Sequence, residues 1–280
     1  MIYSQPSYAL REDNTMGIGE LIGIGNTAKV YRWGKTEVIK LFYDQSSALV
    51  ESKNAELINK LKLRAPKYSG LVDYEGKLGI IYEKIDGPTM LWHIEPTKQS
   101  LSYNAKLMAN LQYELHNIEN KIHPNLKSEI TDKVHASQEM SIQEKEIIKA
   151  KLNSLPDGNS ICHYDFHPDN IIISPNGPII IDWLNLLVGN QEADVTRTAM
   201  MIQSHSLPPN APSWLTDREL REDFNKEYLR EYVKLNNMND EFIERWMLPT
   251  LAVRIDEMQG EYRQEIKDKL KIRLSKIEIS

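Results

Sequence analysis

Short apolar runs alternate with polar residues in the first third of the chain, a pattern typical of half-buried β-strands. A Gly-Lys pair at 34–35 separates two of these runs and favours a tight turn. From 46 to about 63 the apolar spacing becomes helical, and Pro66 ends this stretch. The pattern predicts a β-rich region with one helix and five strands, at 19–23, 28–33, 36–42, 70–74 and 78–85.

Helical spacing dominates after residue 88. Apolar side chains recur one turn apart from 107 to 118 and again from 220 to 232. The sequence Thr-Asp-Arg-Glu at 216–219 predicts a capping box at the start of the second of these helices. Between them, 161–183 contains two apolar strands around a polar loop. We therefore expect an α+β fold with an N-terminal lobe at 1–85 and a mainly helical lobe at 86–280.

The composition excludes several classes of protein. The chain has 280 residues, 34 basic and 40 acidic side chains, and a net charge of −6. Its single cysteine excludes a disulfide scaffold, and no apolar run approaches the roughly 18 residues that span a bilayer. The negative charge argues against a nucleic-acid partner. Because no secretory leader is visible, we expect a cytoplasmic protein that binds neither nucleic acid nor membrane.

A hairpin of small residues follows the first predicted strand. From Gly23 it has the pattern Gly-x-Gly-x-x-Ala and leads directly into the next strand, whereas a dinucleotide-binding fingerprint would open a helix. The hairpin is either a simple turn or a loop over nucleotide phosphates, because missing Cβ atoms let the backbone approach closely. In the second interpretation the nucleotide-binding residues are Gly23, Gly25, Asn26, Thr27, Ala28 and Val30.

A lysine lies among apolar residues in the third predicted strand. Lys40 is either a solvated residue of an edge strand or a cation that holds phosphates under the hairpin. The second role needs a carboxylate that positions the lysine, and the following helix offers Glu51 and Glu56. We expect Glu56, which lies deeper in the helix, to be the partner and Glu51 to be a surface charge.

The strongest chemical signal is the sequence His-Tyr-Asp-Phe-His-Pro-Asp-Asn at 163–170. Asp165 and Asn170 lie five residues apart, a spacing that lets the carboxylate face a substrate hydroxyl while the amide turns to a metal ion. Asp182 ends an apolar strand twelve residues after Asn170, and oxygen ligands of this kind suit Mg²⁺. The alternative is a polar loop that contains only structural hydrogen bonds.

Two histidines flank the central aspartate of this segment. A zinc site from His163 and His167 would need further ligands, and Cys162 points to the opposite side of its strand. A nucleophilic dyad would need a serine or thiol partner, which the segment does not clearly offer. We predict that both histidines hold the backbone of the loop.

These segments resemble those of the aminoglycoside phosphotransferase family, a branch of the protein-kinase-like superfamily that includes choline kinase-like enzymes. The family's usual His-Gly-Asp-x-His-x-x-Asn segment matches 163–170, with Tyr164 in place of glycine, and its Ile-Asp-Trp segment matches 181–183. Residues 110–116 are similar to its Leu-His helix, and 192–197 to its Asp-Leu-Ala segment. The resemblance extends in order from about residue 17 to residue 200.

The resemblance implies a bilobal protein-kinase-like fold and a phosphotransferase that uses ATP or GTP with Mg²⁺. It makes Asp165 the catalytic base, gives Mg²⁺ to Asn170 and Asp182, and gives phosphates to Lys40, paired with Glu56. Asp194 would brace the catalytic loop. The connector at 82–85 would offer backbone groups to the purine, and the residues we assign to this role are Glu83 and Ile85.

Three functions are open at this point. We favour a small-molecule kinase whose acceptor is a hydroxyl of an aminoglycoside-like antibiotic, an amino-alcohol or a sugar. A protein kinase fits less well, because Trp183 stands where that class has phenylalanine and no Ala-Pro-Glu follows. A regulatory nucleotide-binding module fits less well, because Lys40, Asp165, Asn170 and Asp182 are all chemically intact. The acids of the last helices alternate with arginines and do not identify the acceptor.

Overall fold

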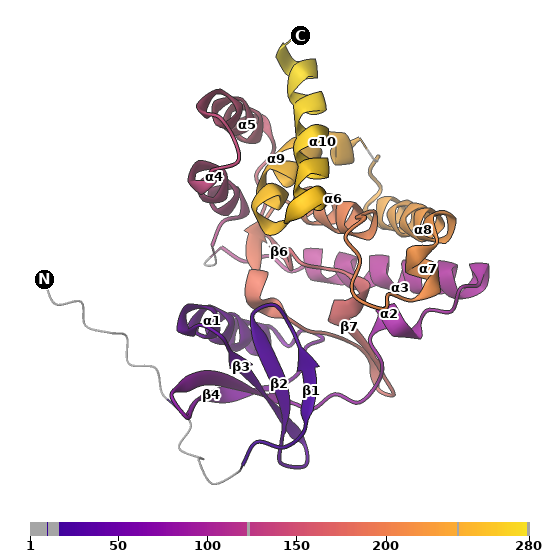
Figure 1. The fold of residues 1–280 in the computed structure, drawn as a ribbon. Coiled ribbons are helices and arrows are strands. Elements are labelled where there is room, and N and C mark those ends of the chain that lie inside the picture. Colours follow the sequence, from indigo (N-terminus) through magenta and orange to yellow (C-terminus); the bar gives the residue numbers. More distant parts are fainter. Residues whose placement is uncertain (1–9, 11–16, 122–123, 240, 279–280) are drawn as a thin grey trace, which may run out of the picture. The chain divides into compact units, whose positions relative to one another are not determined.

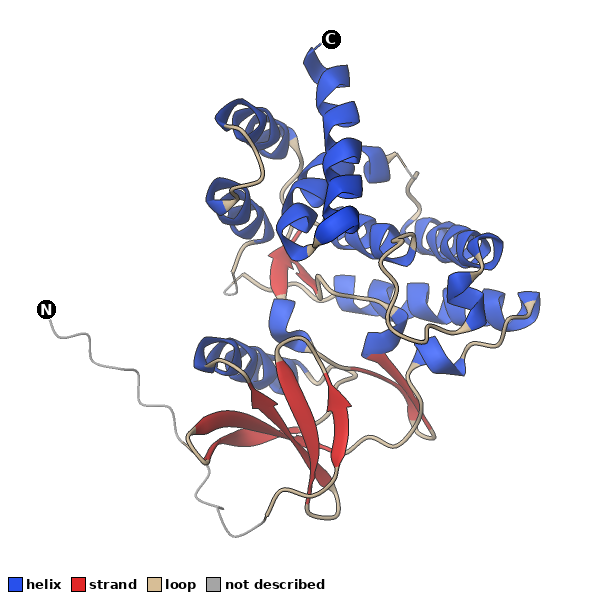
Figure 2. Cartoon of the chain, viewed as in Figure 1, coloured by secondary structure: helices blue, strands red, loops and turns tan. Residues whose placement is uncertain are grey.

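The chain divides into two compact units in the computed structural model, which describes residues 10, 17–121, 124–239 and 241–278. Unit 1 comprises Met1–Thr89 and Asp169–Asn185, and unit 2 comprises Met90–Pro168 and Leu186–Ser280. A single boundary between 85 and 86 does not describe this division, because the chain leaves unit 1 and later returns to it. Strands are concentrated in unit 1 and helices in unit 2 (Figure 2), so the predicted α+β class is confirmed.

Unit 1 is built on an antiparallel sheet with the strand order β1-β2-β3-β5-β4 (Figure 1). Alternation along the strands gives the sheet two apolar faces. Ile39 packs with Trp33 on one face, and Phe42 packs with Ile80 and with Ala48 of the following helix on the other. The strands are β1 Leu21–Ile24, β2 Ala28–Trp33, β3 Glu37–Phe42, β4 Tyr68–Tyr74 and β5 Lys77–Glu83.

Helix α1, Gln45–Leu61, follows β3 and packs against β3, β4 and β5. Asp44 caps its N-terminus by accepting a hydrogen bond from the backbone N–H of Ser47 at 2.8 Å. At the other end Lys62 takes a left-handed backbone with a φ of 55°, which ends the helix. The two caps fix the length of the helix and hence which of its side chains reach the sheet.

The returning segment attaches to unit 1 through backbone hydrogen bonds. It contains the 3₁₀ turn η1 Pro168–Asn170, the hairpin of β7 Ile171–Ser174 and β8 Gly177–Ile180, and the turn η2 Trp183–Asn185. Ile173 donates its N–H to the carbonyl of Pro88 at 2.9 Å, and Ile180 donates to the carbonyl of Arg64 at 2.7 Å. Asn54 of α1 donates its side-chain amide to the carbonyl of Trp183 at 2.7 Å. These bonds place the residues after β8 beside α1.

Unit 2 is mainly helical. Helix α3 packs against α8, and α9 packs against both α6 and α10. A two-stranded ladder pairs β6 Ser160–Cys162 with β9 Leu187–Gly189. The helices are α2 Met90–His93, α3 Lys98–His116, α4 Leu126–Ala136, α5 Ile142–Ser154, α6 Gln191–Ile202, α7 Ser213–Thr216, α8 Arg218–Asn236, α9 Phe242–Glu257 and α10 Gly260–Glu278.

Helix α8 follows the predicted periodicity but begins at a different cap. Phe224, Tyr228 and Tyr232 are fully buried, as their one-turn spacing predicts. The expected capping box at 216–219 is wrong, because Asp217 is the N-cap residue and accepts the backbone N–H groups of Glu219 and Leu220. The helix therefore begins one residue later than a capping box at Thr216 would place it.

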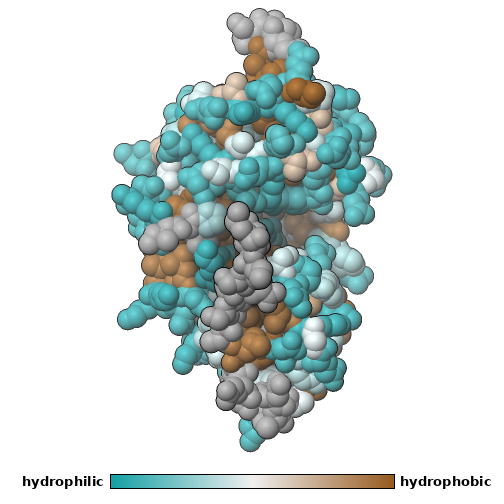
Figure 3. Space-filling model, turned by 90° about the vertical axis from the view of Figure 1, so that its left-hand side faces the viewer, coloured by the Kyte–Doolittle hydropathy of each residue, from teal (hydrophilic) through white to brown (hydrophobic). Residues whose placement is uncertain are grey.

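Hydrophilic residues cover most of the visible surface of unit 2 (Figure 3), and a hydrophobic patch lies near the C-terminal end of α10. The exposed large apolar residues of that helix are Ile272 and Ile277. In the described part of the chain, every helix is too short or too polar to cross a bilayer.

Candidate active site

Lys40 forms the centre of a charged cluster in unit 1. Strand alternation places it on the same face of β3 as Phe42, which is the face that α1 covers. Its Nζ donates to Glu51 Oε2 at 2.7 Å and to Asp182 Oδ1 at 2.9 Å, and its side chain is only 12% exposed. A lysine from β3, a glutamate from α1 and an aspartate from the returning segment therefore meet within unit 1.

Glu51 is the partner of Lys40, so the expected pairing with Glu56 is wrong. Glu51 lies on the buried stripe of α1 with Ala48, Ala55 and Ile58, whereas Glu56 is exposed. Five residues rotate a side chain by about 140° around a helix, so the two glutamates cannot face the same strand. The apolar stripe that includes Glu51 was the signal that could have identified it.

Tyr82 holds the second oxygen of Glu51. Its hydroxyl donates to Glu51 Oε1 at 3.1 Å, while Lys40 occupies Oε2. Burial and the nearby charge of Glu51 raise the pKa of Tyr82 well above its ordinary value, so the tyrosine stays a phenol and a donor. Burial alone would lower the pKa of Lys40, but the charges of Glu51 and Asp182 outweigh it and raise that pKa. The cluster thus keeps the lysine charged.

Asn170 and Asp182 lie at neighbouring ends of the β7–β8 hairpin. Ile181 donates its backbone N–H to the carbonyl of Asn170 at 3.0 Å. Asp182 has a φ of 62°, a left-handed conformation that is disfavoured for residues with a side chain. Its side chain is 38% exposed, whereas Asn170 is buried. The hairpin brings an amide and a carboxylate side chain to one edge of unit 1.

A pocket of about 440 Å³ lies beside this cluster in unit 1. A Cβ added at Gly23 would meet no other atom within 4 Å, so the protein's own packing does not require glycine there. Asn26, Glu56 and Asn170 do not line the pocket. Of the predicted nucleotide-binding and metal residues, those that do are Gly23, Gly25, Thr27, Ala28, Val30, Lys40, Glu83, Ile85 and Asp182.

Asp165 belongs to unit 2, in the segment 163–168 that follows β6. Its Oδ2 lies 3.8 Å from Nε2 of His167, and its backbone N–H donates to Nδ1 of the buried His163 at 3.3 Å. Burial would raise the pKa of Asp165, but the hydrogen bond and charge of His167 and the charges of Arg197 and His163 hold it below its ordinary value. The aspartate is therefore ionised at neutral pH.

Asp194 of α6 is bonded to the same segment. It accepts the backbone N–H groups of His163 at 3.1 Å and of Tyr164 at 2.8 Å. His116 and Gln112 of α3 donate to its Oδ2 at 3.0 and 3.1 Å. Asp194 thus bonds the backbone of the segment, and its role as a brace for a catalytic loop stays a prediction. Gln112 and His116 lie in the stretch 110–116, which the sequence singled out without assigning a contact to either residue.

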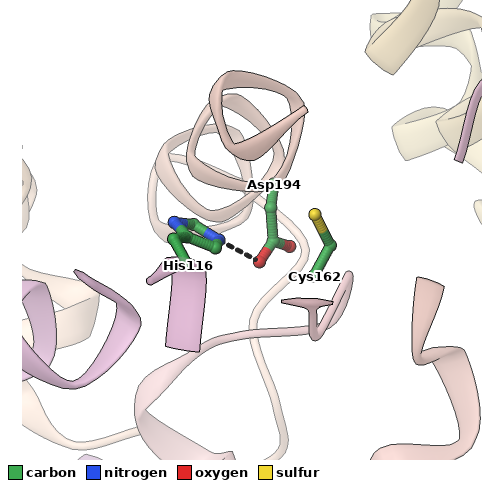
Figure 4. A group of neighbouring side chains, drawn as sticks. All are labelled: His116, Cys162 and Asp194. Carbon is green, nitrogen blue, oxygen red and sulfur yellow. Dashed lines mark hydrogen bonds and ion pairs between the residues drawn. The ribbon is translucent and has the colours of Figure 1, made fainter. Parts of the chain in front are cut away.

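Cys162 completes a buried group with His116 and Asp194, whose potential ligand atoms lie within 4.8 Å of one another (Figure 4). The other ring nitrogen of His116 bonds to the hydroxyl of Tyr232 at 2.6 Å. Burial raises the pKa of the Cys162 thiol well above its ordinary value, so it stays protonated. The aspartate and the histidine are already engaged in hydrogen bonds. The group therefore packs against the segment 163–168 and supports its backbone.

A family model described as the phosphotransferase enzyme family matches residues 93–238, more than half of the chain. The chain belongs to the phosphotransferase enzyme family. No curated protein matches this sequence.

Solved structures share the fold of this chain at low identity. Aminoglycoside phosphotransferase APH(4)-Ia has a TM-score of 0.63 and 11% identity, with 94% of this chain and 93% of that chain covered. The amicoumacin kinase hAmiN in complex with AMP-PNP has a TM-score of 0.61 and 13% identity, over 94% and 90%. A choline/ethanolamine kinase family protein from Mesorhizobium loti has a TM-score of 0.60 and 11% identity, also over 94% and 90%. The expected kinase-like fold is confirmed.

Tyr164 is the position at which this chain departs from the His-Gly-Asp-x-His-x-x-Asn segment that the sequence resembles. Its φ is 59°, a left-handed backbone that glycine adopts freely and that costs roughly 1–3 kcal/mol for other residues. The conformation explains why the segment usually has glycine there. In this chain a fully buried tyrosine takes the same conformation, and the surrounding contacts must hold it.

Proposed function

We propose that the protein transfers the γ-phosphate of ATP or GTP to a hydroxyl group of a small molecule. The observation that carries this proposal is the cluster of Lys40, Glu51 and Asp182, which lines a pocket beneath a hairpin of small residues. Within unit 1 the pocket combines a lysine cation, a hairpin backbone with open space beside Gly23, and apolar walls. Solved structures of the same fold, one a complex with AMP-PNP and another a complex with GDP and kanamycin, support the choice of ligands.

The unit 1 pocket suits a nucleotide. Ile22 and Val38 give it apolar walls, as an aromatic base requires, and Lys40 supplies a positive charge for phosphates. The open space next to Gly23 lets the backbone of the hairpin approach a phosphate group. Glu83 is the last residue of β5 and Ile85 lies two residues beyond it, and both line the same pocket, where their backbone groups can meet the edge of a base.

The residues present fit a magnesium ion. Asn170 and Asp182 offer only hard oxygen donors, and the hydrogen bond from Ile181 to Asn170 keeps the two residues at one edge of the hairpin. Asp182 is partly exposed, so its second carboxylate oxygen can accept a ligand while Oδ1 faces Lys40. When bound there, Mg²⁺ would neutralise charge on the phosphate oxygens.

Asp165 orients the acceptor hydroxyl and receives its proton. An aspartate whose pKa lies below the ordinary value is a weak base, so it holds the hydroxyl by a charge-assisted hydrogen bond and takes the proton late in the transfer. The acceptor that we propose is an aminoglycoside-like antibiotic, an amino-alcohol or a sugar. Such molecules present several hydroxyl groups on a compact frame.

A panel of acceptors tests this function. Calorimetry with MgATP and MgGTP measures binding, and release of ADP or GDP in the presence of each acceptor measures transfer. Saturating nucleotide at a hundred times its dissociation constant should stabilise the fold by about 2.7 kcal/mol. A protein that binds neither nucleotide would refute the proposal, and one that binds nucleotide but transfers to no acceptor would favour a regulatory module.

Asp165→Asn separates chemistry from binding. Loss of the general base should lower turnover by about 10²–10⁴-fold while nucleotide affinity stays the same. Asp157→Asn, at a side chain that is 83% exposed, is the matched control and should leave both unchanged. Near-parental turnover in Asp165→Asn would remove Asp165 from its proposed role.

A further inference from the structure

The peptide that carries Asp165 starts from a disfavoured backbone. Tyr164 precedes the aspartate directly and has a φ of 59° with its side chain fully buried. Asp194 fixes the amide side of this residue by accepting the N–H groups of His163 and Tyr164. The carbonyl side, which leads into Asp165, needs a separate partner, because a left-handed residue persists only where its surroundings determine it.

Arg197 of α6 is that partner. Its Nε donates to the carbonyl of Tyr164 at 2.6 Å, and its guanidinium lies over the Tyr164 ring at 4.6 Å from the centroid. Its Nη2 donates to both oxygens of Glu257 at 3.0 and 2.9 Å. The side chain of Arg197 is 4% exposed and that of Glu257 is 26% exposed. One arginine thus ties the Tyr164 carbonyl to the last residue of α9.

The arrangement leaves other hydrogen bonds unmade. Within the part of the chain that the structure describes, Arg197 Nη1 and the Tyr164 hydroxyl are buried without a hydrogen-bond partner. Unsatisfied buried groups of this kind are rare and costly. The contacts that Arg197 does make hold the ion pair with Glu257 and fix the carbonyl next to Asp165.

We propose that Arg197 is a positioning residue for phosphoryl transfer, which holds the Tyr164 carbonyl and so sets the direction of the Asp165 carboxylate, with Glu257 anchoring the arginine. This rests on the proposed function, in which Asp165 meets the acceptor hydroxyl. Arg197 touches neither substrate in this scheme. It acts through the backbone of the segment 163–168.

Arg197→Lys tests this role without leaving a buried charge unpaired. Lysine can keep the ion pair with Glu257, but it lacks the rigid fork that also reaches the Tyr164 carbonyl. Arg254→Lys is the matched control. Arg254 lies on α9 together with Glu257 and donates to Glu257 Oε2 at 2.7 Å, but the carbonyl of Tyr164 is bonded by Arg197 and not by Arg254. Both variants preserve charge, so a difference between them reports the bond to the carbonyl.

Two measurements decide the outcome. In steady-state transfer to the best acceptor, Arg197→Lys should lower kcat by about tenfold or more, the loss expected for one charged hydrogen bond, with nucleotide affinity unchanged. In hydrogen exchange, peptides that cover 160–168 should exchange faster in Arg197→Lys than in the parent or in Arg254→Lys. Parental kcat, or an equal loss of kcat in both variants, would overturn the proposal.

The exchange measurement also separates this proposal from the proposed function. If the parent transfers phosphate to no acceptor, the proposed function fails, but faster exchange in Arg197→Lys alone still supports the role of Arg197 in holding the segment. Unchanged exchange in Arg197→Lys would overturn that role whatever the activity. A fall in nucleotide affinity with unchanged kcat would also overturn it, because Arg197 is not one of the residues that line the pocket we assign to the nucleotide.

Discussion

Replacing Glu51 with glutamine tests the charged cluster of unit 1 directly. Glu51 is 1% exposed and its Oε2 lies 2.7 Å from Nζ of Lys40. With an effective dielectric constant of about 20, two unit charges at this separation attract by roughly 6 kcal/mol. Desolvation of both charges offsets much of that attraction, and removing one partner of a buried pair costs about 3–5 kcal/mol.

Two features of the cluster reduce the expected cost. Asp182 lies 2.9 Å from Lys40 and still neutralises it, and the glutamine oxygen still accepts a hydrogen bond. Burial also raises the pKa of Glu51 above its ordinary value although Lys40 lies beside it, so the net gain from its charge is reduced. We therefore expect Glu51→Gln to lower the free energy of unfolding by about 1.5–3 kcal/mol, the range for a hydrogen bond to a charged group. Because Lys40 is then held less firmly, the affinity for MgATP or MgGTP should fall as well.

Glu56→Gln is the control for this measurement. Glu56 lies on the same helix, but its side chain is exposed, so its loss should change the free energy of unfolding by less than about 0.5 kcal/mol. Urea unfolding followed by circular dichroism gives both values. Equal effects of the two substitutions would refute the reasoning, and a larger effect of Glu56→Gln would restore the pairing that the sequence suggested.

Two further predictions concern Tyr82, which is bonded to Glu51, and Asp194, which is bonded to the segment 163–168. Tyr82→Phe removes a 3.1 Å bond to Glu51 and should lower the free energy of unfolding by about 1 kcal/mol, measured in the same urea titration. Burial would raise the pKa of Asp194, but hydrogen bonds from His116 and Gln112 and the charge of His116 bring it below its ordinary value of about 3.9. The stabilisation that ionised Asp194 provides is thus present above pH 4 and lost as the pH falls further. In Asp194→Asn the free energy of unfolding should therefore depend less steeply on pH below pH 4, and an unchanged dependence would contradict this.

Local sequence patterns were enough to predict most of the strands and helices. Period-2 alternation identified the strands around Ile39 and Ile80, and one-turn spacing identified the buried tyrosines of α8, because both periods follow from backbone geometry alone. The N-cap of α8 was placed one residue early, since Thr216 and Asp217 are both good capping residues and the sequence does not show which one leaves the helix.

Contacts between distant segments could not be derived in this way. Lys40 and Asp182 are 142 residues apart, and Arg197 and Glu257 are 60 apart. The sequence predicted a role for Lys40 and a role for Asp182, but not the contact between them. No motif in the sequence indicated the pair of Arg197 and Glu257. Glu51 is different, because its place on the stripe of Ala48, Ala55 and Ile58 was readable, and the choice of Glu56 ignored the rotation of the helix.

The division of the chain has a consequence for how activity can be separated from binding. Lys40, Glu51, Asn170 and Asp182 all belong to unit 1, whereas Asp165, Asp194 and Arg197 belong to unit 2. The chain passes from one set to the other between Pro168 and Asp169. If the proposed roles hold, every contact that nucleotide binding requires lies in one unit. Substitutions at Asp165 or Arg197 should then change transfer and leave nucleotide affinity intact, whereas substitutions at Glu51 should change affinity first.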